Sequence, residues 1–173
     1  MPRLSAEELC ERLARDLPGV LLPDTPLQVR PPPAHGPPPA RRANVDPLVV
    51  PAQIVAAAIY MRDTLDYAFL SDIAVVDYLL DGVFELVYRF YNVAGGPSLV
   101  LKTRLPREQP EVPSLTPVWP GANFHEREAF DLYGIVFTGH PFLRRIYMWD
   151  EFEGFPMRRD FPRQGDKYIG EEE

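Results

Sequence analysis

The clearest pattern in the sequence is a strict alternation of apolar and polar positions on both sides of a short turn. From residue 83 to residue 91, every second side chain is large and apolar: Phe84, Leu86, Tyr88 and Phe90. A second alternating run covers residues 99–105, and the glycine-containing segment 92–97 separates the two runs. A period of two places alternate side chains on one face of a sheet, so this pattern predicts a β-hairpin with one buried face.

Two amphipathic helices are predicted before the hairpin. Ser5 and Glu8 have the spacing of a capping box, in which each side chain bonds the other residue's backbone N–H. The apolar stripe that follows consists of Leu9, Leu13 and Leu17. The second helix is predicted from Pro51, which suits a first turn, to about Thr64. Its stripe consists of Ile54, Ala58, Met61 and Leu65.

Further strands complete the predicted fold. The apolar residues 73–76 indicate a buried strand. Residues 45–50 indicate a short one, in which Pro47 favours an edge position. Helices that precede a strand and a hairpin make an α+β arrangement. We therefore predict a small mixed sheet backed by helices.

A third, short helix is predicted to end at Gly134, a residue that suits a helix stop. Asn123 is its expected N-cap, with Glu126 three residues later as a second capping box. Arg127 and Asp131 lie four residues apart, a spacing at which opposite charges pair on a helix.

Proline content changes this picture in the first third of the chain. The chain has 173 residues and 21 prolines, eleven of them between residues 18 and 51. The low-complexity stretch 31–39 indicates a polyproline-type linker or surface loop, with a ligand for a proline-binding domain as the alternative. The predicted regions are 1–30 (helix and extended segment), 31–43 (Pro-rich loop), 44–118 (α/β head) and 119–173 (motif helix and extended arm).

Aromatic residues concentrate in the last region. Residues 119–162 hold 11 of the 20 aromatic side chains, with little periodicity after Tyr133. Aromatic residues and arginines are typical of interface cores, so we predict that this arm docks on a partner protein. The alternative is an arm that packs over its own sheet.

Four arginines flank Trp149 in the arm: Arg144, Arg145, Arg158 and Arg159. The planar guanidinium suits bidentate pairing with carboxylates, so we expect pairs with acidic groups of the partner. The alternative is pairing within the chain, with Glu126, Glu128 or Asp160.

Charge and motifs exclude several classes of function. The net charge of −7 argues against binding to nucleic acid or to an anionic membrane. A single cysteine, Cys10, excludes an internal disulfide, and an iron–sulfur cluster or Cys-rich zinc site held by this chain alone. The charged amphipathic start and the lack of a long apolar run predict a cytoplasmic protein. Phosphate-binding loops and a nucleophile elbow are absent from the sequence.

Acidic and histidine residues near the third helix raise one catalytic alternative. They are His125, Glu126, Glu128, Asp131 and His140, the residue types of a hydrolytic or metal site. The spacings Glu-x-x-His and His-Glu-x-x-His are absent, and carboxylates at a helix start are usually caps. An interaction module is therefore the default, and a free-standing carboxylate enzyme is the alternative.

A long motif points to a family. It has the form Glu-Arg-Glu, two residues, an acid, two apolar residues, six residues, His, three residues, a basic residue, one residue and an apolar pair. Its positions are Glu126, Arg127, Glu128, Asp131, Leu132, Tyr133, His140, Arg144, Ile146 and Tyr147. The later run 153–162, with Arg158, Arg159 and Asp160, is also similar to the family pattern. Over about residues 45–162 the chain resembles the 30 kDa subunit family of the respiratory NADH:quinone oxidoreductase, complex I.

The resemblance implies a role without chemistry of its own. A family member would be a non-catalytic structural subunit of the hydrophilic peripheral arm, on the cytoplasmic side of the membrane. The complex transfers electrons from NADH to quinone and translocates protons. Flavin and iron–sulfur clusters would be bound by other subunits, and this chain would bind no cofactor or metal. Its expected partners are the subunit-D-like protein of the quinone cavity and the subunit-B-like protein of the terminal cluster.

The resemblance leaves the electron donor open, because the donor binds elsewhere. The alternative is the same module in a ferredoxin:quinone oxidoreductase or an energy-converting hydrogenase. In either case the expected motif and interface residues are Glu126, Arg127, Glu128, Asp131, His140, Arg144, Arg145, Trp149, Arg158, Arg159 and Asp160.

Overall fold

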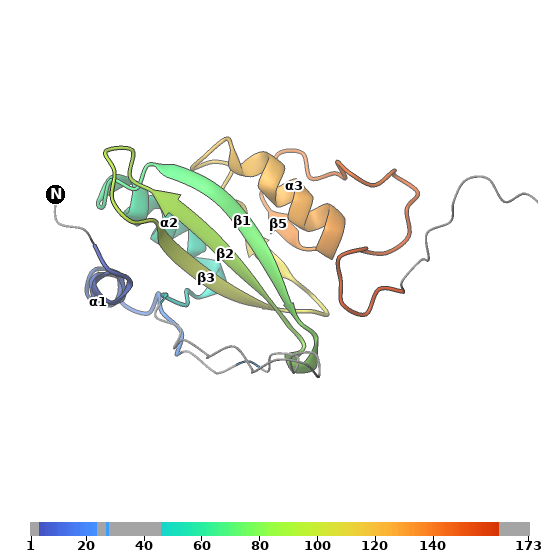
Figure 1. The fold of residues 1–173 in the computed structure, drawn as a ribbon, viewed down its shortest axis with the longest axis horizontal. Helices are drawn as coiled ribbons and strands as arrows, with labels where there is room; N and C mark the ends of the chain where they lie inside the picture. Colours follow the sequence, from blue (N-terminus) through green and yellow to red (C-terminus); the bar gives the residue numbers. More distant parts are fainter. Residues whose placement is uncertain (1–3, 24–26, 28–45, 163–173) are drawn as a thin grey trace, which may run out of the picture.

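The computed structural model describes residues 4–23, 27 and 46–162, so the predicted Pro-rich loop 31–43 lies outside the described residues. Its helices are α1 (Ala6–Asp16), η1 (Pro51–Gln53), α2 (Ile54–Asp63), η2 (Leu79–Asp81) and α3 (Ala122–Tyr133). Its strands are β1 (Phe69–Tyr78), β2 (Val83–Tyr91), β3 (Leu99–Pro106), β4 (Glu111–Pro113) and β5 (Val136–Thr138). Figure 1 shows α2 behind the main sheet, α1 at one end of it and α3 at the other. The predicted α+β class is confirmed.

The main sheet has three antiparallel strands in the order β1-β2-β3. The predicted hairpin is β2–β3, in which Phe84 faces Leu105 and Phe90 faces Leu99. Parallel pairing occurs in the separate two-stranded ladder β4–β5 and in an isolated bridge between Leu48 and Lys102. The mixed pairing expected from the sequence therefore comes from these short additions, while the main sheet itself is antiparallel.

The first helix forms as its sequence predicts. Ser5 and Glu8 make a reciprocal capping box, with N···O distances of 3.2 and 2.8 Å. Leu9 and Leu13 are completely buried. The Tyr60 hydroxyl donates a hydrogen bond of 2.5 Å to the Asp16 carboxylate, which joins the end of α1 to α2.

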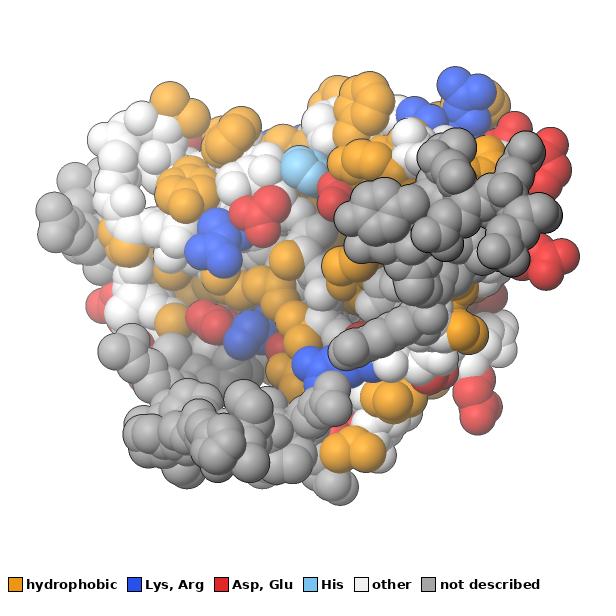
Figure 2. Space-filling model, turned by 45° about the vertical axis from the view of Figure 1, so that its right-hand side comes forward, with side chains coloured by type: hydrophobic (Ala, Val, Ile, Leu, Met, Phe, Trp, Pro, Cys, Tyr) orange, Lys and Arg blue, Asp and Glu red, His pale blue; other side chains and the backbone are white. Residues whose placement is uncertain are grey.

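The chain after β5 forms an arm, defined here as residues 139–162, without helix or strand. Figure 1 shows this arm beside α3, far from α1. On the side of the molecule that carries α3 and the arm, hydrophobic side chains reach the surface next to basic ones (Figure 2). The arm is thus held against the head but leaves apolar groups exposed.

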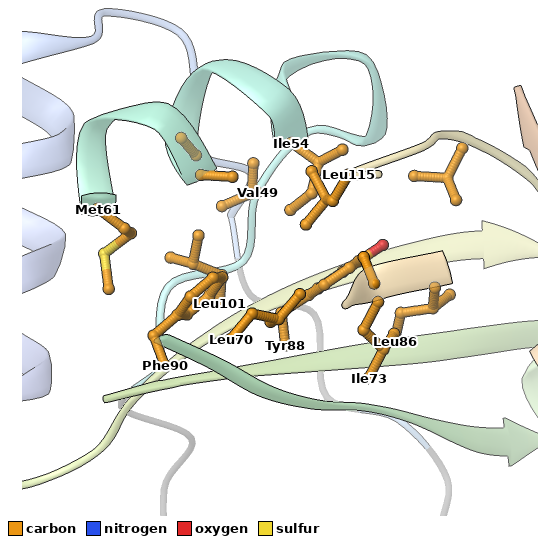
Figure 3. Close-up of a cluster of buried hydrophobic side chains, with 14 of the residues drawn as sticks. Val49, Ile54, Met61, Leu70, Ile73, Leu86, Tyr88, Phe90, Leu101 and Leu115 are labelled. Carbon is orange, nitrogen blue, oxygen red and sulfur yellow. The ribbon is translucent and has the colours of Figure 1, made fainter. Parts of the chain in front are cut away.

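The core lies on the face of the sheet that the helices cover. In Figure 3, Leu86 and Tyr88 of β2 and Leu101 of β3 point toward the side where Ile54 and Met61 of α2 lie. All five side chains are completely buried. Burial of a large apolar side chain contributes about 1.5–3 kcal/mol, so this layer holds the head together.

Two strand predictions need correction. Residues 45–50 form only isolated bridges, at Leu48 and Val49, rather than a strand. The strand expected at 73–76 exists within β1, but it is not buried on both faces. β1 is an edge strand of the main sheet, and its Ala74 side is exposed. A short apolar run did not distinguish an edge strand from a central one.

Candidate functional site

The candidate site is the junction between α3 and the arm, where the motif residues gather. α3 begins with Gly121 as its N-cap and has no side-chain capping bond. Asn123 lies inside the helix, so the predicted second capping box is wrong. Glu126 instead points into the protein, where it is completely buried.

Glu126 fixes the loop that precedes α3. Its Oε1 atom accepts the backbone N–H of Leu115 at 2.6 Å, and its Oε2 atom accepts the hydroxyls of Ser114 at 2.6 Å and Thr116 at 3.2 Å. Burial raises the pKa of the Glu126 carboxyl above its usual range, although these hydrogen bonds oppose that shift. The residue therefore acts as an acceptor that ties the loop to α3.

Asp131 is the acceptor that holds the arm. The carboxylate is completely buried and receives a hydrogen bond of 2.8 Å from Arg145 Nη1. It also accepts three successive backbone N–H groups, those of Ile146 at 2.9 Å, Tyr147 at 2.6 Å and Met148 at 3.0 Å. Burial alone would raise the pKa of Asp131, but the backbone hydrogen bonds and Arg145 outweigh it and lower the pKa below its usual value.

The predicted pair between Arg127 and Asp131 is wrong. Arg127 donates instead to two backbone carbonyls of the arm, those of Arg144 at 3.1 Å and Arg145 at 3.3 Å. The helix therefore uses one acid and one base, four residues apart, to hold the same stretch of the arm. Tertiary partners replaced the local one because the arm offers Asp131 four donors at once.

Arg145 and Arg158 are both engaged within their own chain. Arg145 donates to Asp131 and also to the carbonyls of Phe152 at 3.1 Å and Gly154 at 3.0 Å. Arg158 donates to the Tyr133 carbonyl at 2.8 Å. Burial lowers the pKa of Arg158, with nearby Arg107 acting in the same direction. The Arg145 partner, Asp131, is not among the acids that the sequence suggested.

A second attachment joins the end of the arm to the sheet. Asp77 on β1 is 4% exposed and accepts two hydrogen bonds from Arg107, at 2.8 and 3.1 Å. It also accepts the backbone N–H of Arg159 at 2.9 Å. Arg107 in turn binds Asp160 at 2.7 Å, which connects the arm to the head twice. The sequence analysis missed Asp77 and Arg107, which carry no local signal of this role.

The remaining predicted residues lie at the surface. The side chain of Trp149 is 62% exposed, and Glu128, Arg144 and Arg159 are exposed as well. Arg144 stacks over the Phe142 ring at 4.4 Å from its centroid. The interface role of these residues stays a prediction.

His140 lies beside Glu126 and its side chain is equally buried. Its Nε2 atom is 4.0 Å from the Glu126 carboxylate and 3.4 Å from the Asn123 carbonyl, while Nδ1 accepts the N–H of Phe142 at 3.0 Å. Neither side chain has exposed surface, so no substrate reaches this pair in the structure. Burial lowers the pKa of His140, which keeps the ring neutral and Nδ1 free to accept.

This geometry predicts a pH effect on stability. The unfolded chain binds a proton at His140 near pH 6.5, whereas the folded chain does so only at lower pH. The contribution of His140 is therefore complete above about pH 6.5 and is lost as the pH falls through the lowered pKa. In urea unfolding between pH 8 and pH 5, His140→Gln should remove part of the decline, whereas His125→Gln should keep it. Equal pH profiles for wild type and His140→Gln would contradict this prediction.

Two further observations concern the described part of the chain. Among these residues, no His, Cys, Asp and Glu side chains form a group of three or more that suits a metal ion. No helix within the described ranges has the length and apolar character needed to cross a membrane.

Comparison with known proteins agrees with the motif. Residues 48–167 match the family model described as the respiratory-chain NADH dehydrogenase, 30 kDa subunit. The C 2 protein of the NADH-quinone oxidoreductase of Rhizobium meliloti is 50% identical over 122 residues, which is 69% of this chain and 66% of that protein. The corresponding C protein of Moorella thermoacetica is 47% identical over 122 residues, 70% of this chain and 82% of that protein.

A solved structure extends the likeness to the fold. A chain of the membrane-bound sulfane sulfur reductase, an archaeal respiratory membrane complex, matches with a TM-score of 0.67. The match covers 90% of this chain and 85% of that chain, and at 23% identity it concerns the fold alone. On the evidence of the family model and the curated relatives, this chain belongs to the family of the 30 kDa subunit of respiratory-chain NADH dehydrogenase.

Proposed function

We propose that this chain is a non-catalytic structural subunit of the hydrophilic peripheral arm of complex I. It would support the transfer of electrons from NADH to quinone, coupled to proton translocation, without taking part in the chemistry. Flavin and iron–sulfur clusters would be bound by its partners, and this chain would bind no cofactor. Family membership and the names of the relatives support the proposal.

The observation that carries this proposal is how the motif acids are used. Glu126 and Asp131 are buried and spend their oxygens on hydrogen bonds within the chain. They hold the arm in one conformation before any partner arrives, which lowers the entropy cost of association. An acid of this kind supports binding rather than catalysis.

The expected neighbours are the subunit-D-like protein that forms the quinone cavity and the subunit-B-like protein that holds the terminal cluster. Contact with them would place the chain on the cytoplasmic side of the membrane as a peripheral component. Exposed aromatic side chains on the arm, such as Tyr147 and Trp149, support a docking role.

The electron donor of the assembly is a separate question. The names of the curated relatives favour NADH over the alternative, a ferredoxin:quinone oxidoreductase or an energy-converting hydrogenase. This chain takes the same structural part in each case.

Purification through a tag on the full chain tests the proposal. We expect solubilised membranes to yield a complex with NADH:quinone activity, whose flavin and iron remain with other subunits when this chain is dissociated. Stoichiometric flavin or iron in the dissociated chain would contradict the non-catalytic role. Recovery of the chain without partner subunits would contradict membership of a complex.

A further inference from the structure

We propose that Phe124, Phe142 and Arg144, joined through Arg127, form a docking surface for a partner-protein segment that carries a carboxylate next to apolar side chains. We call these four residues the aromatic–arginine surface. The inference rests on the proposed function and adds the chemistry of the partner. It removes Arg145 and Arg158 from the interface and keeps Arg144.

The four side chains form one continuous surface. The arm runs beside α3, with His140 next to the Asn123 carbonyl and the Arg144 carbonyl bound to Arg127. Arg127 also lies over the Phe124 ring, at 5.8 Å from its centroid, and Arg144 lies over the Phe142 ring at 4.4 Å. Helix and arm therefore present their aromatic rings and guanidinium groups together.

The rings are exposed far more than a core would leave them. Phe124 is 65% exposed and Phe142 is 57% exposed. In the view of Figure 2, hydrophobic side chains reach the surface beside basic ones on this side of the molecule. Contiguous exposed apolar groups of this kind mark interaction sites, and aromatic residues with arginine are the types that contribute most to binding.

Charge identifies the partner group. Among the described residues, neither Arg127 nor Arg144 forms an ion pair with a carboxylate, and Arg127 uses its donors on carbonyl oxygens. This side of the molecule is therefore locally positive, while the whole chain has a net charge of −7. An extended polyanion such as nucleic acid or an anionic membrane would meet that overall repulsion. A single carboxylate on a protein segment would not.

Stacking prepares Arg144 for this partner. A guanidinium that lies flat on an aromatic ring keeps its edge free for a bidentate bond and loses little freedom when the bond forms. A partner side chain that covers Phe142 would also remove water from the ion pair and strengthen it. The surface thus combines an apolar contact with a charged one.

Rebinding of the purified full chain to complex prepared from cells that lack it measures this contact. We expect Arg144→Ala and Phe142→Ala each to weaken binding at least about tenfold, which corresponds to about 1.4 kcal/mol. The matched controls are Arg89→Ala and Phe69→Ala, which remove a partly exposed arginine and an aromatic ring that is 54% exposed. They should change affinity less than about twofold. All four variants should keep the wild-type melting temperature.

A cross-linker identifies the occupant. A photoreactive phenylalanine analogue at position 142 should cross-link to a partner subunit at a segment that contains Asp or Glu. Replacement of that acid by Arg should restore binding of Arg144→Glu. Wild-type affinity in Arg144→Ala, cross-linking to lipid, or a cross-linked segment without an acid would overturn the inference and leave the proposed function standing. Failure of the wild-type chain to bind the complex would overturn the proposed function itself.

Discussion

Replacement of Asp131 by alanine should release the arm from α3. Asp131 is completely buried and accepts four hydrogen bonds from the segment 145–148. Without it, Arg145 keeps a buried charge with no acid opposite, and three backbone N–H groups lose their acceptor. Removal of one partner from a buried ion pair typically costs about 3–5 kcal/mol, and we expect a loss of that size for closure of the arm.

Hydrogen exchange is the measurement that shows where this loss falls. The amides of residues 146–148 should exchange much faster in Asp131→Ala, whereas those of β2 should stay protected, because the arm can open without the head. Asp160→Ala is the matched control. Its side chain is half exposed and also binds an arginine, and such exposed pairs contribute about 0–1 kcal/mol. Equal effects of the two substitutions would contradict the role assigned to Asp131.

A pH titration of wild type and Asp131→Ala gives an independent check. The pKa of Asp131 is lowered in the folded chain. Its stabilising effect is therefore present above the unfolded pKa of about 3.9 and is lost as the pH falls through the lowered folded value. Arm closure in the wild type should weaken in this acidic range, and Asp131→Ala should lack that part of the pH dependence.

Patterns with a short sequence range predicted the head well. Alternation located β2 and β3, and all four large side chains of β2 are completely buried. The Ser5–Glu8 capping box and the Gly134 stop also formed as predicted. Each of these features depends on residues within four positions of one another or on a simple period, so the sequence carries the whole signal.

The site was predicted only in part, because its contacts span greater distances along the chain. The motif placed Glu126, Asp131 and His140 in one region, and the structure brings them to the junction of α3 and the arm. Local rules assigned Glu126 to a cap and Asp131 to Arg127, yet their partners lie 10–17 residues away. Burial decides between such alternatives, since an acid withdrawn from water needs every hydrogen bond it can accept.

Gly134 is a second position where the arm depends on α3, and its replacement by alanine should be strongly destabilising. The residue ends α3 with φ +76°, a conformation that favours glycine. A Cβ atom there would lie 2.5 Å from two carbons of the Phe155 ring and 2.9 Å from Arg158 Nη2. Phe155 itself stacks against Arg158, so the ring cannot move away without disturbing the arm.

Gly139 offers a control with the same backbone strain and no clash. Its φ is +80°, and an added Cβ atom would meet nothing within 4 Å. Gly139→Ala should therefore cost only the left-handed conformation, about 1–2 kcal/mol. Gly134→Ala should cost about 1–3 kcal/mol more, because overpacking adds to the strain. Thermal unfolding should show the larger drop for Gly134→Ala, and limited proteolysis should cut its arm faster. Equal melting temperatures for the two variants would show that Phe155 yields without cost and that Gly134 serves the helix end alone.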